Sequence, residues 1–195
     1  YVAQMTEGIA LLQRNLERSV ELLADFRQVA ADQASEQRRR FDLADAVREI
    51  LHTLSPSLKR HAHKVVVNIP AGIFMDSLPG PLGQVVINLV NNAYLHAFEG
   101  RSHGVLTIQA RQEGDEVLMA FIDNGVGMAP DHLAKLFVPF FSTKIGKGGT
   151  GVGMAIVRNL VGKALGGRVT VSSVLGEGTR FDLVLPCVLP VQAAS

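Results

Sequence analysis

Four polar side chains recur at every fourth position in an otherwise apolar stretch. Gln84, Asn88, Asn92 and His96 share one face of a helix predicted over residues 81–98, because a spacing of four residues keeps side chains on one helix face. Burying an amide without a hydrogen-bond partner costs about 1 to 3 kcal/mol. The stripe therefore indicates a polar object beside the helix, either a ligand or, as the alternative, neighbouring backbone and solvent.

Two glycine-containing segments have residue types that suit a binding site. Asp123 ends a strand predicted over residues 116–123 and precedes Asn-Gly-Val-Gly-Met, which puts a carboxylate beside backbone that a flat ring can approach; alone, the segment is common turn chemistry. The run Gly-Gly-Thr-Gly-Val-Gly-Met at residues 148–154 precedes a helix predicted over residues 152–165. Amides at a helix start attract anions such as phosphate, although the run matches neither the Walker A pattern nor the dinucleotide fingerprint.

The composition excludes several classes of protein. The chain has 195 residues, 47% of them hydrophobic, and a net charge of +1, so neither nucleic acid nor an acidic membrane is expected as a partner. No run of about 20 apolar residues predicts a membrane span, and the single cysteine, Cys187, fits a reducing compartment. We expect this segment to be cytoplasmic and without direct membrane contact, whether or not a longer parent protein is membrane-anchored.

Residues 1–40 are predicted to form a bundle helix followed by a linker. Apolar residues alternate in steps of four and three between Met5 and Ala30, which is the period of a coiled coil or helix bundle. One helix cannot bury such a stripe, so we expect a dimer; an amphipathic helix packed on its own domain is the alternative. The polar run 31–40 is interpreted as a linker or a solvated helix end. Because the helical pattern is under way at Tyr1, we expect the chain to be part of a longer protein.

Residues 41–195 are predicted to form one α+β domain. The expected helices are 43–60, 81–98, 131–136 and 152–165, and the expected strands are 64–69, 73–76, 105–112, 116–123, 168–173 and 179–185. Runs of strands beside separate helices favour a two-layer sandwich, with helices on one face of a largely antiparallel sheet.

Five segments, in order, resemble the N, G1, F, G2 and G3 boxes of the ATP-binding domain of sensor histidine kinases. They are the Asn-bearing helix, DNGVGM at 123–128, LFVPFFSTK at 136–144, GGTGVGM at 148–154 and GEGT at 176–179. The resemblance covers residues 41–186 and implies a Bergerat-type α/β sandwich with a mixed, mostly antiparallel sheet. Residues 1–40 resemble the second helix of the family's dimerisation and phosphotransfer bundle, which implies a homodimer.

The resemblance also implies roles in a site for ATP and Mg²⁺. Asn92 would be the Mg²⁺ ligand, and Asn88 would lie beside the phosphates or the water shell of the metal. Asp123 would accept a hydrogen bond from the adenine amine, and Thr179 would reach the same edge of the base. Lys144 would act in catalysis together with the two asparagines. The other residues expected to contact the nucleotide are His96, Gly125, Gly127, Thr143, Gly149, Thr150, Gly151, Val152, Gly153 and Met154.

The implied reaction is phosphoryl transfer and not hydrolysis. Asn88 stands where hydrolysing relatives have a glutamate, and a carboxamide cannot act as a general base at neutral pH. The γ-phosphoryl group would pass to a histidine and then to an aspartate of a response-regulator receiver domain. None of the six histidines (His52, His61, His63, His96, His103 and His132) stands at the family's acceptor position, so we expect the acceptor upstream of Tyr1.

Two other functions and one structural alternative stay open. The same fold would serve an ATP-binding regulatory module that transfers no phosphoryl group, or a kinase of protein serine. Phe137, Phe140 and Phe141 would anchor a mobile lid over the nucleotide, or would simply pack in the core.

Overall fold

The computed structural model describes residues 37–58, 62–144 and 149–190 of the chain. The bundle helix predicted between Met5 and Ala30 lies outside these residues, so the helix, its dimer and the domain boundary stay predictions. Within the described part of the chain, no helix is both long and apolar enough to cross a bilayer.

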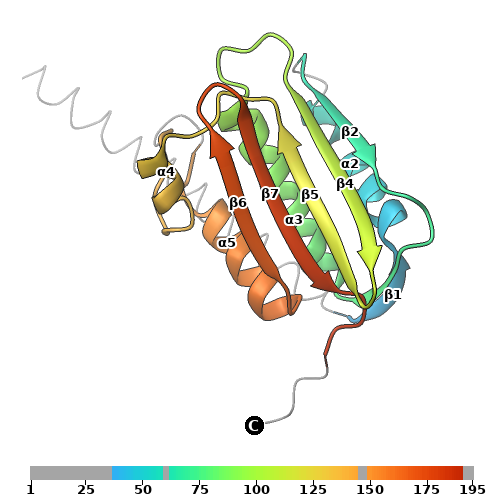
Figure 1. Ribbon diagram of the computed structural model, residues 1–195. Coiled ribbons are helices and arrows are strands. Elements are labelled where there is room, and N and C mark those ends of the chain that lie inside the picture. Colours follow the sequence, from blue (N-terminus) through green and yellow to red (C-terminus); the bar gives the residue numbers. More distant parts are fainter. Residues whose placement is uncertain (1–36, 59–61, 145–148, 191–195) are drawn as a thin grey trace, which may run out of the picture.

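A five-stranded sheet forms one layer of the domain (Figure 1). Its order is β2-β4-β5-β7-β6, with β2 parallel to β4 and every other neighbouring pair antiparallel. The strands are β2 (Lys64–Asn68), β4 (Val105–Glu113), β5 (Glu116–Asp123), β6 (Arg168–Val174) and β7 (Gly178–Pro186). Burial alternates along β4 and β7, as expected for a sheet that packs its apolar side chains on one face. The α+β class with a mixed, mostly antiparallel sheet is confirmed.

Helices form the second layer behind this sheet (Figure 1). They are α2 (Leu43–Leu58), α3 (Pro79–Asn92) and α5 (Gly153–Asn159), with a short α4 (Pro130–Lys135) at the end of β6. The α3 helix contacts both α2 and α5, and its Val85 and Leu89 are buried in one core with Phe121 and Leu183 of the sheet. The central position of α3 explains why it is apolar on nearly every side.

Two of the helices, α3 and α5, end in a π-helical turn. The α3 helix continues as η2 (Ala93–Ala97), and α5 continues as η3 (Leu160–Ala164). The helices predicted over residues 81–98 and 152–165 therefore exist as continuous helical segments whose last turn is wider than an α-helix. Such turns are rare and are often found at functional sites, and η2 borders the cavity described below.

A two-stranded sheet corrects the interpretation of residues 31–40. The β1 strand (Arg39–Asp42) pairs antiparallel with β3 (Phe74–Ser77). Arg38 donates hydrogen bonds of 2.9 and 3.0 Å to the two carboxylate oxygens of Asp76. The linker or helix-end interpretation was wrong for residues 39 and 40, because this strand is stabilised by a partner more than 30 residues away and not by any local pattern.

Candidate functional site

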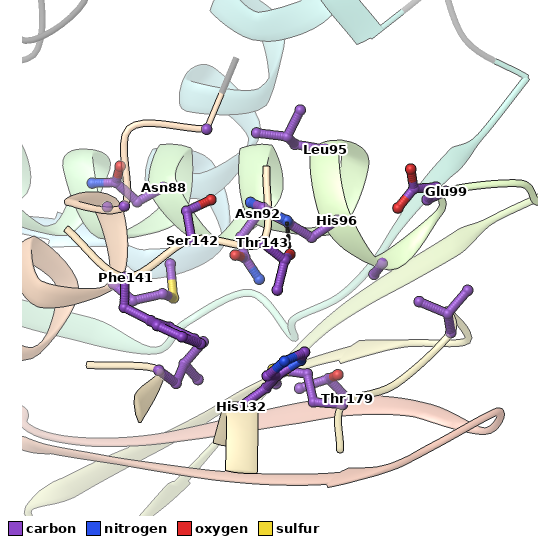
Figure 2. Close-up of a pocket in the computed structure, with 18 of the residues that line it drawn as sticks. Asn88, Asn92, Leu95, His96, Glu99, His132, Phe141, Ser142, Thr143 and Thr179 are labelled. Carbon is purple, nitrogen blue, oxygen red and sulfur yellow. Dashed lines mark hydrogen bonds between the residues drawn. The ribbon is translucent and has the colours of Figure 1, made fainter. Parts of the chain in front are cut away.

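A cavity of about 330 Å³ lies against α3 and η2 (Figure 2). Figure 2 shows Asn92 and His96 on the helical side, and His132 and Thr179 on the opposite side. The predicted site residues that line the cavity are Asn88, Asn92, His96, Gly127, Thr143, Gly149, Thr150, Gly151, Gly153 and Met154, together with Thr179. Four predicted residues are outside the lining: Asp123, Gly125, Lys144 and Val152.

The amide stripe of α3 is divided between the cavity and the core. The Nδ2 group of Asn88 donates to the backbone oxygen of Gln84 at 3.0 Å. Its Oδ1 atom faces Gly153, where an added Cβ would lie 3.2 Å away. Gln84 is only 9% exposed and does not line the cavity, and its Oε1 atom has no partner among the described residues. Asn88 therefore presents an oxygen acceptor beside the start of α5.

His96 and Lys144 connect η2 with the loop that follows α4. The Oγ1 atom of Thr143 lies 3.4 Å from Nδ1 of His96. The Lys144 ammonium pairs with Glu99 at 2.7 Å. Burial lowers the pKa of His96, the charge of Lys144 lowers it further, and Glu99 opposes the shift. The surroundings of the ring therefore favour its neutral form.

Asp123 is a buried carboxylate at the end of β5, opposite Thr179 in the sheet register. Its Oδ1 atom accepts hydrogen bonds from the amides of Gly125 at 2.8 Å and Thr179 at 3.1 Å. Burial raises the pKa of Asp123, while these two hydrogen bonds and the charge of Arg101 lower it. Both hydrogen bonds from the described residues use Oδ1, and neither uses Oδ2.

Two glycines beside Asp123 are required by the chain's own packing. A Cβ on Gly125 would collide with the carbonyl of Ala97, and a Cβ on Gly127 would collide with the carbonyl of Val174. Gly127 also has a φ of +66°, a conformation that side chains disfavour. The approach of a flat ring was the reason expected for glycine in this segment, and the contact of Gly127 with β6 is a second one.

The three phenylalanines after α4 differ in their surroundings. Phe137 packs against the core. Phe141 lines the cavity, with its ring 5.8 Å from that of His132. Phe140 is 56% exposed, has a φ of +66°, and donates its amide to the oxygen of Gly151 at 2.9 Å. Core packing thus accounts for Phe137 alone.

Sequence reasoning missed several residues of the site. The cavity lining also includes Leu95, Ala97, Glu99, Val126, Met128, His132, Leu136 and Ser142. It also missed Ser173, which is outside the lining but contacts Met128, Gly178 and Thr179 through its hydroxyl group. Ser173 is the strand partner of Thr179 in the hairpin of β6 and β7. Aligning the two predicted strands of this hairpin could therefore have placed Ser173 beside Thr179.

The class of protein follows from this geometry. Amides on a central helix and two glycine segments surround one cavity beside a mostly antiparallel sheet, and a buried carboxylate, Asp123, is the strand partner of Thr179 in its lining. Residues 78–189 match the family described as histidine kinase-, DNA gyrase B-, and HSP90-like ATPase. The chain belongs to this family, and the match covers more than half of its 195 residues.

Relatives specify the branch of the family, and a solved structure matches the fold. The chain is 41% identical to the sensor histidine kinase ZraS of Salmonella typhi over 111 residues, which are 56% of this chain and 23% of that protein. It is 34% identical to the alginate biosynthesis sensor protein KinB of Pseudomonas aeruginosa over 151 residues, which are 74% of this chain and 24% of that protein. The fold matches the catalytic domain of histidine kinase ThkA with a TM-score of 0.68 at 23% identity, over 78% of this chain and 97% of that one. The domain is thus the ATP-binding domain of a sensor histidine kinase, and the chain spans about a quarter of the length of these two curated relatives.

Proposed function

We propose that this chain is the catalytic portion of a sensor histidine kinase. It binds Mg·ATP in the cavity beside α3 and transfers the γ-phosphoryl group to a histidine upstream of this chain. The observation that carries the proposal is the arrangement of acceptors around one cavity. The amide oxygen of Asn88 lies on one wall beside Gly153, and the Asp123 carboxylate is paired in the sheet with Thr179 of the lining.

The residues on the phosphate side fit a triphosphate with Mg²⁺. This cation prefers oxygen ligands and keeps several waters while it binds phosphate oxygens, so Asn92 would hold it and Asn88 would order its waters. The first hydrogen bond of the α5 helix runs from the Ile156 amide to the Val152 oxygen at 3.0 Å. The amides of residues 153–155 are therefore not used within the helix, and they support an interaction with phosphate oxygens.

The residues on the other side fit adenine. The Oδ2 atom of Asp123 would accept from the exocyclic amine, and the Thr179 hydroxyl would contact the same edge of the base. Val126, Gly127 and Met128 line the cavity here and would form the surface under the ring. Because Asp123 is buried, its hydrogen bond to a base would be shielded from water.

The chain's own residues would contribute position and charge to the transfer. Asn88 has no basic group, so it would orient the phosphates without activating water. Lys144, held by Glu99 at 2.7 Å, would bring a positive charge near the phosphates when the loop closes. Bound Mg²⁺ would neutralise charge on the phosphoryl group as it is transferred. Holding the reactants in one geometry would supply the rest of the acceleration.

Partners and location form a further part of the proposal. The sensor-kinase names of the relatives support a homodimer through residues 1–40 and relay to a response-regulator receiver domain. The free, buried thiol of Cys187 supports a cytoplasmic location for this domain.

Incubation with γ-labelled ATP and a separately produced phosphotransfer segment of a sensor histidine kinase tests the proposal. We expect label on the segment that is lost in acid and kept in base, as phosphohistidine requires, and none with Asn92→Ala. Tight ATP binding without transfer would favour the regulatory module instead. Acid-stable label would favour the serine kinase.

A further inference from the structure

Ser173 forms three contacts at the adenine end of the cavity. Its Oγ atom accepts a hydrogen bond from the Met128 amide at 2.9 Å and donates one to the Gly178 carbonyl at 2.8 Å. It also lies 2.9 Å from Oγ1 of Thr179. Ser173 thereby connects the segment after β5 with the turn before β7 and with a hydroxyl group of the cavity lining.

The proton of each hydroxyl group follows from these contacts. A carbonyl oxygen only accepts and an amide N–H only donates, so the single hydroxyl proton of Ser173 is directed to Gly178. The contact with Thr179 must then use the Thr179 proton, with a lone pair of Ser173 as acceptor. Thr179 has one hydroxyl proton, and after this contact only its lone pairs remain available to the cavity.

We infer that Ser173 is a positioning residue that sets nucleotide specificity, an inference that rests on the proposed function. It holds the Thr179 hydroxyl as an acceptor beside the second acceptor, the carboxylate of Asp123, which is the strand partner of Thr179. A 6-amino purine directs an N–H donor at these two groups. A 6-oxo purine directs a carbonyl oxygen at them, and acceptors facing acceptors form no hydrogen bond. The preference for adenine over hypoxanthine thus depends on a serine outside the cavity lining.

The ratio of the affinities for Mg·ATP and Mg·ITP, measured by calorimetry on the full chain, tests this role. In Ser173→Ala the Thr179 hydroxyl is free to turn and donate to the 6-oxo group, so we expect the ATP preference to fall about tenfold, the value of one hydrogen bond. Ser173→Thr keeps a hydroxyl group and should keep the preference. Ser172→Ala removes the same group from the exposed neighbouring position and is the matched control.

A double-mutant cycle separates specificity from folding. Thr179→Val removes the hydroxyl group on which Ser173 acts, so adding Ser173→Ala to it should leave the ATP to ITP ratio unchanged. Should Ser173→Ala fail to fold, Ser173→Cys keeps the size of the side chain with a weak donor and should shift the ratio in the same direction.

Each contrary result has a distinct meaning. Equal losses of affinity for ATP and ITP in Ser173→Ala would show a merely structural role and overturn the inference, and so would equal affinities in the unmutated protein. An unmutated protein that binds neither nucleotide would overturn the proposed function itself.

Discussion

Asp123→Asn should remove most of the affinity for ATP without cost to the fold. The variant keeps an oxygen that can accept from the amides of Gly125 and Thr179, which Oδ1 of Asp123 now does at 2.8 and 3.1 Å. It replaces Oδ2 with an NH₂ group, so the adenine amine would face a donor instead of an acceptor. A hydrogen bond to a charged group contributes about 1.5 to 3 kcal/mol, which corresponds to a loss of about 10- to 150-fold in affinity.

The stability of the free protein should respond in the opposite direction. Burial raises the pKa of Asp123 above its ordinary value of 3.8, so the folded state favours the protonated form. The stability that this group contributes is present below pH 3.8 and is lost as the pH rises through the raised pKa. Asparagine stays neutral, so the Tm of the variant should match that of the unmutated protein at low pH and exceed it at neutral pH.

Calorimetric titration with Mg·ATP and thermal melts without nucleotide measure the two effects. The matched control is Glu116→Gln, which makes the same change at the exposed far end of β5, where Glu116 pairs with Arg168 at 3.1 Å. Loss of this exposed ion pair should change the ATP affinity and the Tm very little. An Asp123→Asn protein that binds ATP within twofold of the unmutated protein would refute the reasoning.

Three further predictions concern the metal, the backbone and a histidine. Asn92→Ala should abolish the Mg²⁺-dependent part of ATP binding and leave the Tm without nucleotide unchanged; titrations with and without Mg²⁺ test this, and an unaltered Mg²⁺ effect would contradict the ligand role. Gly127→Ala should lower the unfolding free energy by more than about 1 kcal/mol in urea, because the new Cβ meets a backbone carbonyl at a φ of +66°. Gly114→Ala, with a φ of +59° and open space around it, should cost less, and equal losses would rule out the collision. Lys144→Met should raise the pKa of His96, which burial and then the charge of Lys144 hold down; an NMR titration of the ring measures it, and no change would leave burial as the sole cause.

Local patterns were sufficient for most elements of the fold. The predicted strand over residues 116–123 coincides with β5, because a short apolar run that follows a glycine turn is a local signal. The helix predicted over residues 43–60 appears as Leu43–Leu58. In contrast, β1 (Arg39–Asp42) has no such apolar run, and it forms because Arg39 and its neighbours pair with β3 across more than 30 residues.

The candidate site was predictable by residue type but not by orientation. The stripe on α3 suggested four equivalent side chains, yet Asn88 and Asn92 reach the cavity while Gln84 is buried away from it. Lys144 was expected at the nucleotide; it is outside the lining and pairs with Glu99, which lines the cavity. The packing of α3 between α2 and α5 decides which side of the helix faces the cavity. The spacing of polar residues along the helix does not predict which side this is.

The family was predictable without the structure, because five short segments in order carry the residue types that a nucleotide site needs. Most strands and helices were predictable too, because side-chain patterns are local. Only the tertiary structure decided which groups are donors and which are acceptors. Asp123 and Thr179 are 56 residues apart, and Met128 and Ser173 are 45 residues apart. Their hydrogen bonds exist because β5, β6 and β7 are brought into one sheet, which buries the carboxylate and directs the hydroxyl protons.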